Sequence, residues 1–370
     1  MTTPAPSHLV PSEFGYHMPA EWEKHEGTWL AWPKNPLTWF HHLPEVQNVW
    51  LQMIKELSSG EIVNVLVDRG SIKKEIAQSL IALGVDPKAI GKSIKLHILP
   101  TRDAWLRDTG PIFIVNREEK KKAMLDWIFN AWGQKYISDE DPLDEDTCVP
   151  RMINELYPAQ LRFARIEPGI VLEGGSLDTN GKGTLLTTRQ CLLNKNRNPT
   201  LNQQQIEDYL KKYLGMQKII WLNDGVAGDD TDGHVDDIAR FVNENTIVCA
   251  FEDDPKDENY KALAENYETL CNATDQDGKK FNVIKMPMPG VVEAVIPGQK
   301  HTQRFPASYI NFYIGNEVVL VPIFGHTNDG EALKILKDAF PTRRVVGLRC
   351  EHVVWGFGSL HCVSQQEPMV

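Results

Sequence analysis

The sequence has few cysteines, and those it has are scattered. Six cysteines occur among 370 residues, and no two stand in a C-x-x-C spacing or in the close ladder of a disulfide scaffold. This pattern excludes a small disulfide-rich secreted fold and a zinc ribbon. It favours reduced thiols, as in a cytoplasmic protein.

Long apolar runs and basic runs are lacking as well. No segment approaches the roughly 20 apolar residues that span a bilayer, and the opening MTTPAPSHLVPSEF has neither the basic start nor the apolar core of a signal peptide. Lys and Arg total 39 against 50 Asp and Glu, a net charge of -11, without a basic stretch that could follow a phosphate backbone. We therefore expect a soluble cytoplasmic protein with no nucleic-acid or membrane partner. The acidic balance suits a small cationic substrate, and a homo-oligomer is compatible with it.

The rest of the composition is that of a globular protein, with ten tryptophans and a hydrophobic share of 42%. Apolar spacing and cap residues predict helices at 44–60, 71–84, 149–157, 200–215, 259–272 and 329–340. A short apolar segment typical of a strand follows each helix: IVNVLVD, IKLHILP, LRFARIEP, KIIWLND, FNVIKMP and RRVVGL. Strands and helices therefore alternate, as in an α/β protein.

A larger unit repeats along the chain. After each of the last five predicted strands comes a polar or glycine-bearing segment that leads into one or two further strands, so the order strand, loop, strands, helix recurs about five times. A unit that cannot close its own core stacks on its neighbours around an axis. In such a ring, GTWLAWP and IVNVLVD near the N-terminus complete the unit that the C-terminus begins. An ordinary doubly wound sheet is the alternative.

Groups that can do chemistry gather in four of the five loop segments. The last segment, GFGSLHCVSQQ, carries His361 and Cys362. A free cysteine is usually buried and inert, so Cys362 alone is weak evidence for a nucleophile; its glycine-bearing approach and a histidine elsewhere in the chain strengthen that interpretation. In a C-terminal strand successive side chains point to opposite faces, so His361 is expected to face away from Cys362.

The third loop offers that histidine. His234 stands in DDTDGHVDD, which holds five Asp within nine residues. If GHVDDIARF is a strand, His234 and Asp236 share one face and point toward one pocket. A solvated acidic turn explains Asp229 and Asp230 comfortably, but explains less well a His and an Asp two residues apart where an apolar run begins. His234 is therefore the candidate partner of Cys362.

Carboxylates and a tryptophan complete the set. Asp108 and Asp236, if the ring brings them together, form a cage that needs a cation between them, and a planar guanidinium matches two carboxylates better than an ammonium does. Trp105, three residues before Asp108, could cover that cation; packing of Trp105 in the core and pairing of Asp108 with an Arg are the alternatives. Glu173, in LEGGSLD, would orient His234 and keep it protonated, or would belong to a plain turn.

Six motifs in order carry a family resemblance: MPAEWEKHEGTWLAWP, AWLRDTGPIFIV, LEGGSLDTNGKGTLLTT, DGHVDDIARFV, ASYINFYIGNEVVLVPIFG and GSLHCVSQQEP. Spanning about residues 11–370, they make the chain resemble the agmatine deiminases of the guanidino-group modifying (pentein) superfamily. The resemblance implies a five-bladed, pseudo-fivefold α/β propeller of ββαβ units. It implies one catalytic domain over 1–370 with a flexible tail at 1–10, and neither a metal nor an organic cofactor.

The resemblance also implies a role for each candidate residue. The implied roles are nucleophile for Cys362, acid and base for His234, partner of His234 for Glu173, guanidinium ligands for Asp108 and Asp236, and aromatic wall for Trp105. The implied reaction converts agmatine and water to N-carbamoylputrescine and ammonia, a step toward putrescine, through an amidino-cysteine intermediate. Nearby carboxylates would raise the pKa of the thiol in an empty site, and the cationic substrate would reverse this.

The sequence departs from the family pattern near the site. Phe357 stands where the family usually has the middle glycine of GGGNIHC, Ser359 stands where it has asparagine, and Arg102 replaces another common asparagine. These changes bear on the preference for the substrate's tail and on the turnover rate, because every proposed reacting group is present.

A deiminase of free arginine or of peptidyl arginine is the alternative within this class. Free arginine carries an α-carboxylate that requires a cationic clamp. Arg102, Arg107 and Arg240 are open candidates for that clamp.

Two alternatives come from other classes. An H-x-D pair with a distant histidine is also the ligand pattern of a non-haem iron oxygenase, for which His301, His326 or His352 could supply the third ligand. That function expects a jelly roll with few helices and leaves Cys362 without a role. A non-catalytic binding propeller would not need the Cys, the His and three carboxylates together.

Overall fold

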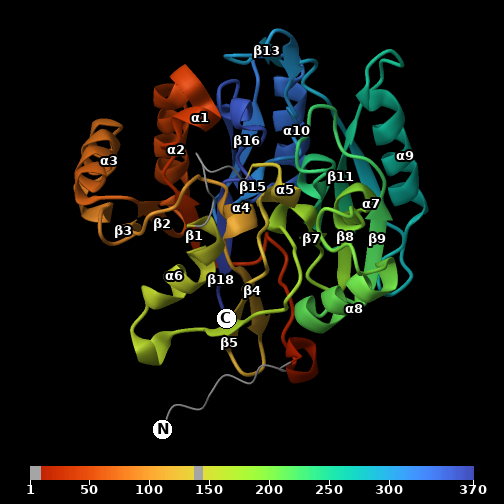
Figure 1. Ribbon diagram of the computed structural model, residues 1–370, viewed down its shortest axis with the longest axis horizontal. Helices are drawn as coiled ribbons and strands as arrows, with labels where there is room; N and C mark the ends of the chain where they lie inside the picture. Colours follow the sequence, from red (N-terminus) through yellow and green to blue (C-terminus); the bar gives the residue numbers. More distant parts are fainter. Residues whose placement is uncertain (1–9, 137–144) are drawn as a thin grey trace.

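The computed structural model describes residues 10–136 and 145–370, so that the tail expected at 1–10 lies, except for Val10, outside the described residues. Five small sheets and one separate hairpin make up the strands of this part of the chain (Figure 1). The five sheets have the orders β18-β1-β2-β3, β4-β5-β6, β7-β8-β9, β10-β11-β12 and β15-β16-β17. The mixed α/β class is therefore confirmed, and the alternative of one doubly wound sheet is wrong.

The strands are mostly short apolar runs. Their bounds are β1 His25–Ala31, β2 Ile62–Val67, β3 Ile94–Ile98, β4 Ile112–Asn116, β5 Lys121–Leu125, β6 Ala164–Ile166, β7 Asp178–Thr179, β8 Thr184–Thr188, β9 Lys218–Leu222, β10 Ala239–Asn243, β11 Thr246–Phe251, β12 Asn282–Pro287, β13 Glu293–Val295, β14 Thr302–Arg304, β15 Tyr313–Ile314, β16 Val318–Ile323, β17 Arg344–Arg349 and β18 Ser364–Pro368. Strands β8, β11 and β16 are buried over most or all of their length. Burial on both faces explains why their sequences read as continuous apolar runs instead of alternating ones.

Each sheet repeats one pattern of pairing. An antiparallel pair comes first and a parallel pair follows, as in β7 with β8 and then β8 with β9. Parallel neighbours need a crossover connection, and a helix supplies it. These crossover helices are α2 Leu43–Leu57, α3 Gly70–Ala82, α6 Val149–Glu155, α8 Gln203–Leu214, α9 Asn259–Asn272 and α10 Asp329–Ala339. All six were predicted from the sequence, within a few residues at each end.

Local sequence accounts for these helices. Helix α8 begins with a capping box, in which the side chains of Asn202 and Gln205 each accept a hydrogen bond from the other residue's backbone N–H. It is capped at its C-terminus by Gly215, whose left-handed φ of 71° suits a residue without a Cβ. Its buried face is made by Ile206, Leu210 and Leu214, which lie four residues apart. Among the described residues, no helix is long and apolar enough to cross a membrane.

The two ends of the chain meet in one sheet. Strand β18 pairs antiparallel with β1, placing Gln365 opposite Trp29, and β1 pairs in parallel with β2. The prediction that N-terminal segments complete the unit begun at the C-terminus is confirmed. As a result, the turn that carries Cys362 lies just before a strand that is held inside a four-stranded sheet.

Short elements, not the long helices, carry the residues of interest. Figure 1 shows α3 and α9 at opposite edges of the molecule, whereas α4 Leu106–Thr109 and α5 Ala131–Gln134 lie near its centre. Helices α1 Pro36–Trp39 and α7 Arg189–Leu192 are equally short. Neither these four elements nor the β13-β14 hairpin was predicted, because one turn of helix and a three-residue strand are too short to show a period.

Candidate active site

A cavity of about 600 Å³ opens among the loops that link the sheets. Cys362, Trp105 and Asp108 line it, together with two aromatic residues that the sequence did not assign to the wall, Trp132 and Trp355. The other lining residues are Asn35, Leu37, Thr38, Phe40, Asp103, Tyr136, Gly228, Asp229, Asp230, Thr231, Ile296, Gln299, Gln303, Gly356, Phe357 and Gly358. The structure thus joins the first, third and last of the predicted loops at one cavity.

Cys362 is buried at this cavity, with 6% of its surface exposed. Its Sγ lies 3.0 Å from Asn311 Nδ2 and 3.7 Å from Asp236 Oδ2. Burial raises the pKa of the thiol well above its ordinary value, and the carboxylates of Asp236, Asp237 and Asp108 raise it further. The direction agrees with the raised pKa expected for an empty site, and burial is its largest cause.

The expectation that His361 faces away from Cys362 is wrong. Strand β18 begins only at Ser364, so Cys362 lies in the turn before it, where side chains do not alternate. His361 Nδ1 lies 2.6 Å from the same Asp236 Oδ2 that faces Cys362. Both neighbours therefore contact one carboxylate.

The strand predicted through His234 and Asp236 is also wrong in its local form. Val235–Asp237 is a turn of 3-10 helix, and β10 begins only at Ala239. The Asp229 carboxylate accepts hydrogen bonds from the backbone N–H groups of Thr231 and Gly233, and these bonds hold the preceding segment as a loop. Both side chains nevertheless reach one place. A Cβ added to Gly175 would lie 2.5 Å from His234 Nδ1 and 3.1 Å from Asp236 Oδ2. Only a glycine lets the backbone pass so close to both groups.

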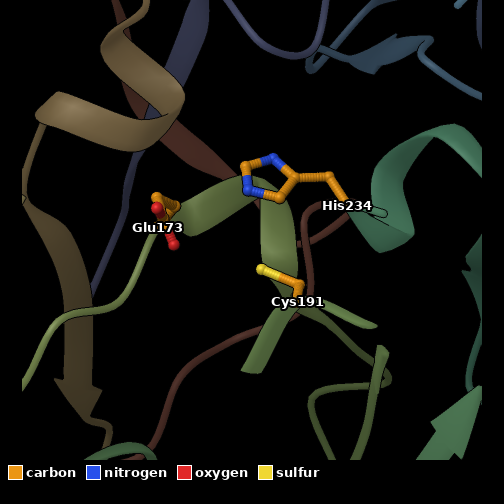
Figure 2. Close-up of side chains that lie close together, drawn as sticks. All are labelled: Glu173, Cys191 and His234. Atoms are coloured by element: carbon orange, nitrogen blue, oxygen red, sulfur yellow. The ribbon is translucent and has the colours of Figure 1, made fainter. Parts of the chain in front are cut away.

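His234 lies beside Glu173 and Cys191, and Figure 2 shows the three side chains directed toward one another. Their ligand-type atoms lie within 4.8 Å of one another. His234 Nδ1 also lies 3.9 Å from Asp108 Oδ2, yet neither ring nitrogen has a hydrogen-bond partner among the described residues. Burial alone would lower the pKa of His234, but Asp108, followed by Cys191 and Glu173, raises it well above the ordinary value. The imidazole is therefore protonated near neutral pH.

Glu173 divides its two oxygens between different surroundings. Oε1 accepts a hydrogen bond from Arg197 Nε at 2.7 Å, while the buried Oε2 has no partner in the part of the chain that the structure describes. Burial raises the pKa of this carboxyl in spite of the Arg197 charge. No hydrogen bond joins Glu173 to His234, so any influence of Glu173 on His234 acts through charge and proximity.

Asp108 is fixed in place by two donors. Its Oδ1 accepts from the Gly175 backbone N–H and its Oδ2 accepts from Trp132 Nε1, both at 2.9 Å. No Arg pairs with Asp108 among the described residues, although such a pairing was an open alternative. The carboxylate thus stays available to a cation in the cavity while its orientation is set by neutral groups.

The glycines that approach Cys362 make room for Trp105. A Cβ added to Gly356 or to Gly358 would lie 2.7 Å from the Trp105 ring. These glycines therefore let the backbone approach the Trp105 ring closely. Trp105 is 6% exposed and packs with its ring centroid 5.6 Å from that of Trp39, so the core interpretation holds, and it also lines the cavity.

The three departures from the family pattern have different surroundings. Phe357 adopts a left-handed φ of 66°, lines the cavity and packs edge-on against Phe305 with 5.5 Å between ring centroids. Ser359 Oγ donates to Asn311 Oδ1 at 2.9 Å. Arg102 is not among the residues that line the cavity, and its backbone N–H donates to Asp146 Oδ1 at 2.7 Å. Of the three, Phe357 alone faces the cavity.

Sequence reasoning missed Asn311, Glu21 and Cys191. Asn311 Oδ1 accepts from Ser359 Oγ and from the His361 backbone N–H, both at 2.9 Å, while its Nδ2 faces the Cys362 sulfur. The fourth loop was set aside because it carries little that ionises, and an amide offers no such signal. Glu21 lies within the first of the six family motifs, which was its only sequence signal.

The residues that would hold an oxygenase iron are not gathered. Among the described residues, two groups of three donors come within 4.8 Å: Glu173 with Cys191 and His234, and Asp236 with Asp237 and Cys362. Neither group contains one of the three histidines proposed as a third ligand. Helices also alternate with sheets throughout, which contradicts the jelly roll that an oxygenase would need.

Comparison with known proteins matches this arrangement to described relatives. The model of the Porphyromonas-type peptidyl-arginine deiminase family matches residues 17–368. A Legionella pneumophila (strain Philadelphia 1) protein named "Putative agmatine deiminase" is 37% identical over 361 residues, covering 97% of each chain. The solved structure of Enterococcus faecalis agmatine deiminase catalysing its reaction has a TM-score of 0.86 and 32% identity over 98% of each chain. That of C. jejuni agmatine deiminase with substrate bound has a TM-score of 0.81 and 31% identity, covering 95% of this chain and 96% of the other.

Proposed function

The chain belongs to the Porphyromonas-type peptidyl-arginine deiminase family, and from that premise we propose that it is an agmatine deiminase. It is a hydrolase that acts on the guanidino C–N bond, converting agmatine and water to N-carbamoylputrescine and ammonia on the route to putrescine. Relatives at 37% and 32% identity that are named for this activity, each covering almost the whole chain, support the assignment.

The charge of the cavity wall is the observation that carries the choice of substrate. Four acidic side chains line the cavity, those of Asp103, Asp108, Asp229 and Asp230, and no Lys or Arg lines it among the described residues. Burial raises the pKa of Asp103 and raises that of Asp230 to about 7, and a bound cation would favour the ionised form of both. Agmatine has a cation at each end, so this wall suits both ends. Free arginine would place an α-carboxylate against the same wall without a clamp.

Two of the arginines considered for that clamp are engaged elsewhere. Arg107 donates to Gln365, Gln366 and Glu21, and it is 3% exposed. Arg240 pairs with Glu21 and Asp178 and is 1% exposed. Both guanidinium groups are buried in ion pairs away from the cavity wall, which leaves them unsuited to bind a substrate carboxylate.

The proposed chemistry begins at Cys362. Its thiolate adds to the guanidinium carbon while Asp108 and Asp236 hold the cation in one orientation beside Trp105. Protonated His234 then gives its proton to the departing nitrogen, the C–N bond breaks and ammonia leaves an amidino-cysteine. The now neutral His234 takes a proton from water, and the resulting hydroxide adds to the cationic amidino carbon. The C–S bond then breaks, and the hydroxyl proton of the adduct passes to the leaving sulfur, which releases the neutral urea product and the thiol.

Substrate binding activates the nucleophile in this scheme. In the empty site burial and three carboxylates raise the pKa of Cys362, so the sulfur is held as a thiol. A guanidinium cation placed among the same carboxylates offsets their charge and favours the thiolate. Asn311 Nδ2, 3.0 Å from Sγ, donates to the anion once it forms. Glu173, through its charge, keeps His234 protonated until the ammonia departs.

We also infer that the five sheets stand as blades of one propeller around a common axis, in a single domain. Each sheet repeats the order of an antiparallel pair followed by a parallel pair, with a helix at the parallel crossover. The pairing of β18 with β1 joins the two ends of the chain, as ring closure requires.

Ammonia release from agmatine, from free arginine and from benzoyl-arginine amide tests the function. We expect rapid release from agmatine alone, and a loss of more than about 10³-fold in kcat for Cys362→Ser, because the step that forms the covalent bond is removed. Cys271→Ser is the matched control, since this thiol is exposed and outside the cavity. Absence of release from agmatine by the wild type would refute the activity, and full activity of Cys362→Ser would refute the mechanism.

Peptidyl-arginine deimination is the second candidate, favoured by the description of the matching family. A peptidyl arginine has no free α-carboxylate, so the missing clamp does not exclude it. It requires a cavity mouth wide enough for a polypeptide. Faster release of ammonia from benzoyl-arginine amide than from agmatine would replace the first proposal with this one.

A further inference from the structure

His361 lies between two buried carboxylates. Its Nδ1 is 2.6 Å from Asp236 Oδ2, and its Nε2 is 2.8 Å from Glu21 Oε2. All three residues are buried, with exposures of 1%, 0% and 7% for His361, Asp236 and Glu21. A carboxylate oxygen can only accept, so both hydrogen bonds form when both ring nitrogens carry a proton. The geometry therefore uses both ring nitrogens of His361 as hydrogen-bond donors.

One end of this bridge reaches the reacting groups. Asp236 Oδ2, the atom bound by His361, faces the Cys362 sulfur at 3.7 Å. Asp236 Oδ1 is buried and has no hydrogen-bond partner among the described residues. Burial alone would raise the pKa of Asp236, but the hydrogen bond and the charge of His361, followed by His234 and Arg240, lower it below the ordinary value. The carboxylate is therefore ionised, with one oxygen occupied and the other open.

The other end of the bridge is anchored from several loops. Glu21 Oε1 accepts from the Ile314 backbone N–H at 2.9 Å and pairs with Arg240 Nη2 at 2.8 Å. Glu21 Oε2 pairs with Arg107 Nη2 at 3.2 Å as well as with His361. These charges fix the position of Glu21, which in turn limits the movement of the imidazole ring.

We propose that His361 is a positioning residue for deimination: bridging Glu21 and Asp236, it holds Asp236 ionised, with Oδ1 turned toward the substrate's guanidinium. The proposal rests on the function proposed above, and it gives a role to a residue that touches neither sulfur nor substrate. It also separates the two buried histidines of the site. Both ring nitrogens of His361 are engaged by carboxylates, whereas those of His234 have no hydrogen-bond partner in the part of the chain that the structure describes, so that they can exchange a proton.

A double-mutant cycle on substrate binding tests the coupling. With Cys362→Ser as the parent, which removes turnover, the Kd of agmatine is measured by calorimetry for His361→Gln, for Asp236→Asn and for the two together. We expect each single change to weaken binding about 10- to 100-fold, the range of one lost charge-assisted contact. The pair should bind no more than about 3-fold more weakly than Asp236→Asn, because His361 acts through Asp236.

Asp108 supplies the matched control for the cycle. Asp108 is likewise a buried carboxylate beside the proposed guanidinium position, but its hydrogen-bond donors are Gly175 and Trp132 and not His361. The losses from His361→Gln and Asp108→Asn should therefore add. His352→Gln, at a histidine stacked on His42 instead of bound to a carboxylate, should leave the Kd of agmatine unchanged.

The outcomes distinguish the two proposals. If His361→Gln weakens agmatine binding by the same factor in the Asp236 and the Asp236→Asn backgrounds, the positioning role is overturned and only a structural role remains. If His361→Gln does not change the Kd at all, the positioning role is overturned as well. If the parent binds butylguanidine but not agmatine, the proposed substrate fails, and the same cycle run with butylguanidine still decides the role of His361. If neither guanidine binds, both proposals fall. Should Asp236→Asn not fold, as judged by circular dichroism, Asp236→Ser replaces it in the cycle.

Discussion

Two buried polar regions meet at Asp236, and they are satisfied to very different degrees. In the central network, Glu21, Arg107, Arg240 and Asp178 all have charged or hydrogen-bonding partners. In the unpaired group, which does not itself line the cavity, Glu173 Oε2, Asp236 Oδ1 and both ring nitrogens of His234 have no hydrogen-bond partner among the described residues, although these residues are just as deeply buried. His361 belongs to both regions.

The two regions differ in whether their buried polar atoms have hydrogen-bond partners. A buried polar atom without a partner costs about 1–3 kcal/mol relative to its hydrogen-bonded state, so such atoms are rare in folded proteins. Four of the eight such atoms found among the described residues belong to Glu173, Asp236 and His234. We propose that the central network stabilises the fold, whereas the unpaired group gains its partners when the substrate binds.

The largest expected effect is a loss of stability on substitution of a residue in the central network. Arg240→Met removes the cation shared by Glu21 and Asp178, and we expect the free energy of unfolding to fall by about 3–5 kcal/mol, because two buried carboxylates lose their partner. Arg344→Met is the control: its pair with Glu56 is exposed, and its loss should cost less than about 1 kcal/mol. Urea unfolding measures both. Similar losses for the two variants would contradict the distinction.

In the unpaired group the expected effect falls on activity instead of stability. His234→Gln should lower kcat by about 10²- to 10⁴-fold, the usual contribution of one acid-base group. Its free energy of unfolding should stay within about 1 kcal/mol of the wild type, because His234 makes no hydrogen bond that the change would break. Steady-state kinetics and urea unfolding on the same preparation test this. A large loss of stability would place His234 with the structural network.

The third prediction concerns the alkylation rate of Cys362, which we expect to differ by about 10-fold or more between a neutral and a cationic reagent. Because its thiol pKa is raised, the thiolate forms only at pH values above the ordinary range, so neutral 2-chloroacetamide should react slowly at neutral pH and faster as the pH rises. Cationic 2-chloroacetamidine, with the same leaving group, should react at least about 10-fold faster, since its charge offsets the carboxylates. Exposed Cys271 serves as the reference thiol in peptide mass spectrometry. Equal rates at Cys362 would argue against substrate-assisted activation.

The smallest expected effect concerns Phe357. Phe357→Gly relieves a left-handed backbone that costs a larger residue about 1–2 kcal/mol, but it loses the contact with Phe305 at the cavity wall. We expect kcat within about 3-fold of the wild type and a rise of less than about 10-fold in KM for agmatine, as for the loss of one apolar contact. Phe40→Ala, at another aromatic of the wall, provides the comparison. A large loss of kcat would contradict this expectation and would indicate that Phe357 takes part in the chemical step.

The sequence predicted best what depends on local periodicity. The six crossover helices and the strands after them were correct, because amphipathic spacing and caps act within a few residues. The expected strands through His234 and Cys362 were wrong. Asp229, five residues before His234, accepts from the Gly233 and His234 backbone N–H groups and holds that segment as a loop. The turn that carries Cys362 is held by Asn311, which is distant in sequence. Cys191 and Asn311 gave no signal at all, because a lone thiol or amide is ordinary until its neighbours are known.

By itself the sequence determined an α/β repeat whose ends meet in one sheet, and it supplied one cysteine, one histidine, three carboxylates and a tryptophan suited to a guanidinium. Tertiary structure alone decided which of their atoms are satisfied. It turned His361 toward Asp236 instead of away from the site, and it left His234 unpartnered beside Glu173 and Cys191. The reason is physical: helix and strand patterns arise from neighbours in the chain, whereas hydrogen bonding and protonation of a buried group depend on residues that only folding brings within a few ångströms.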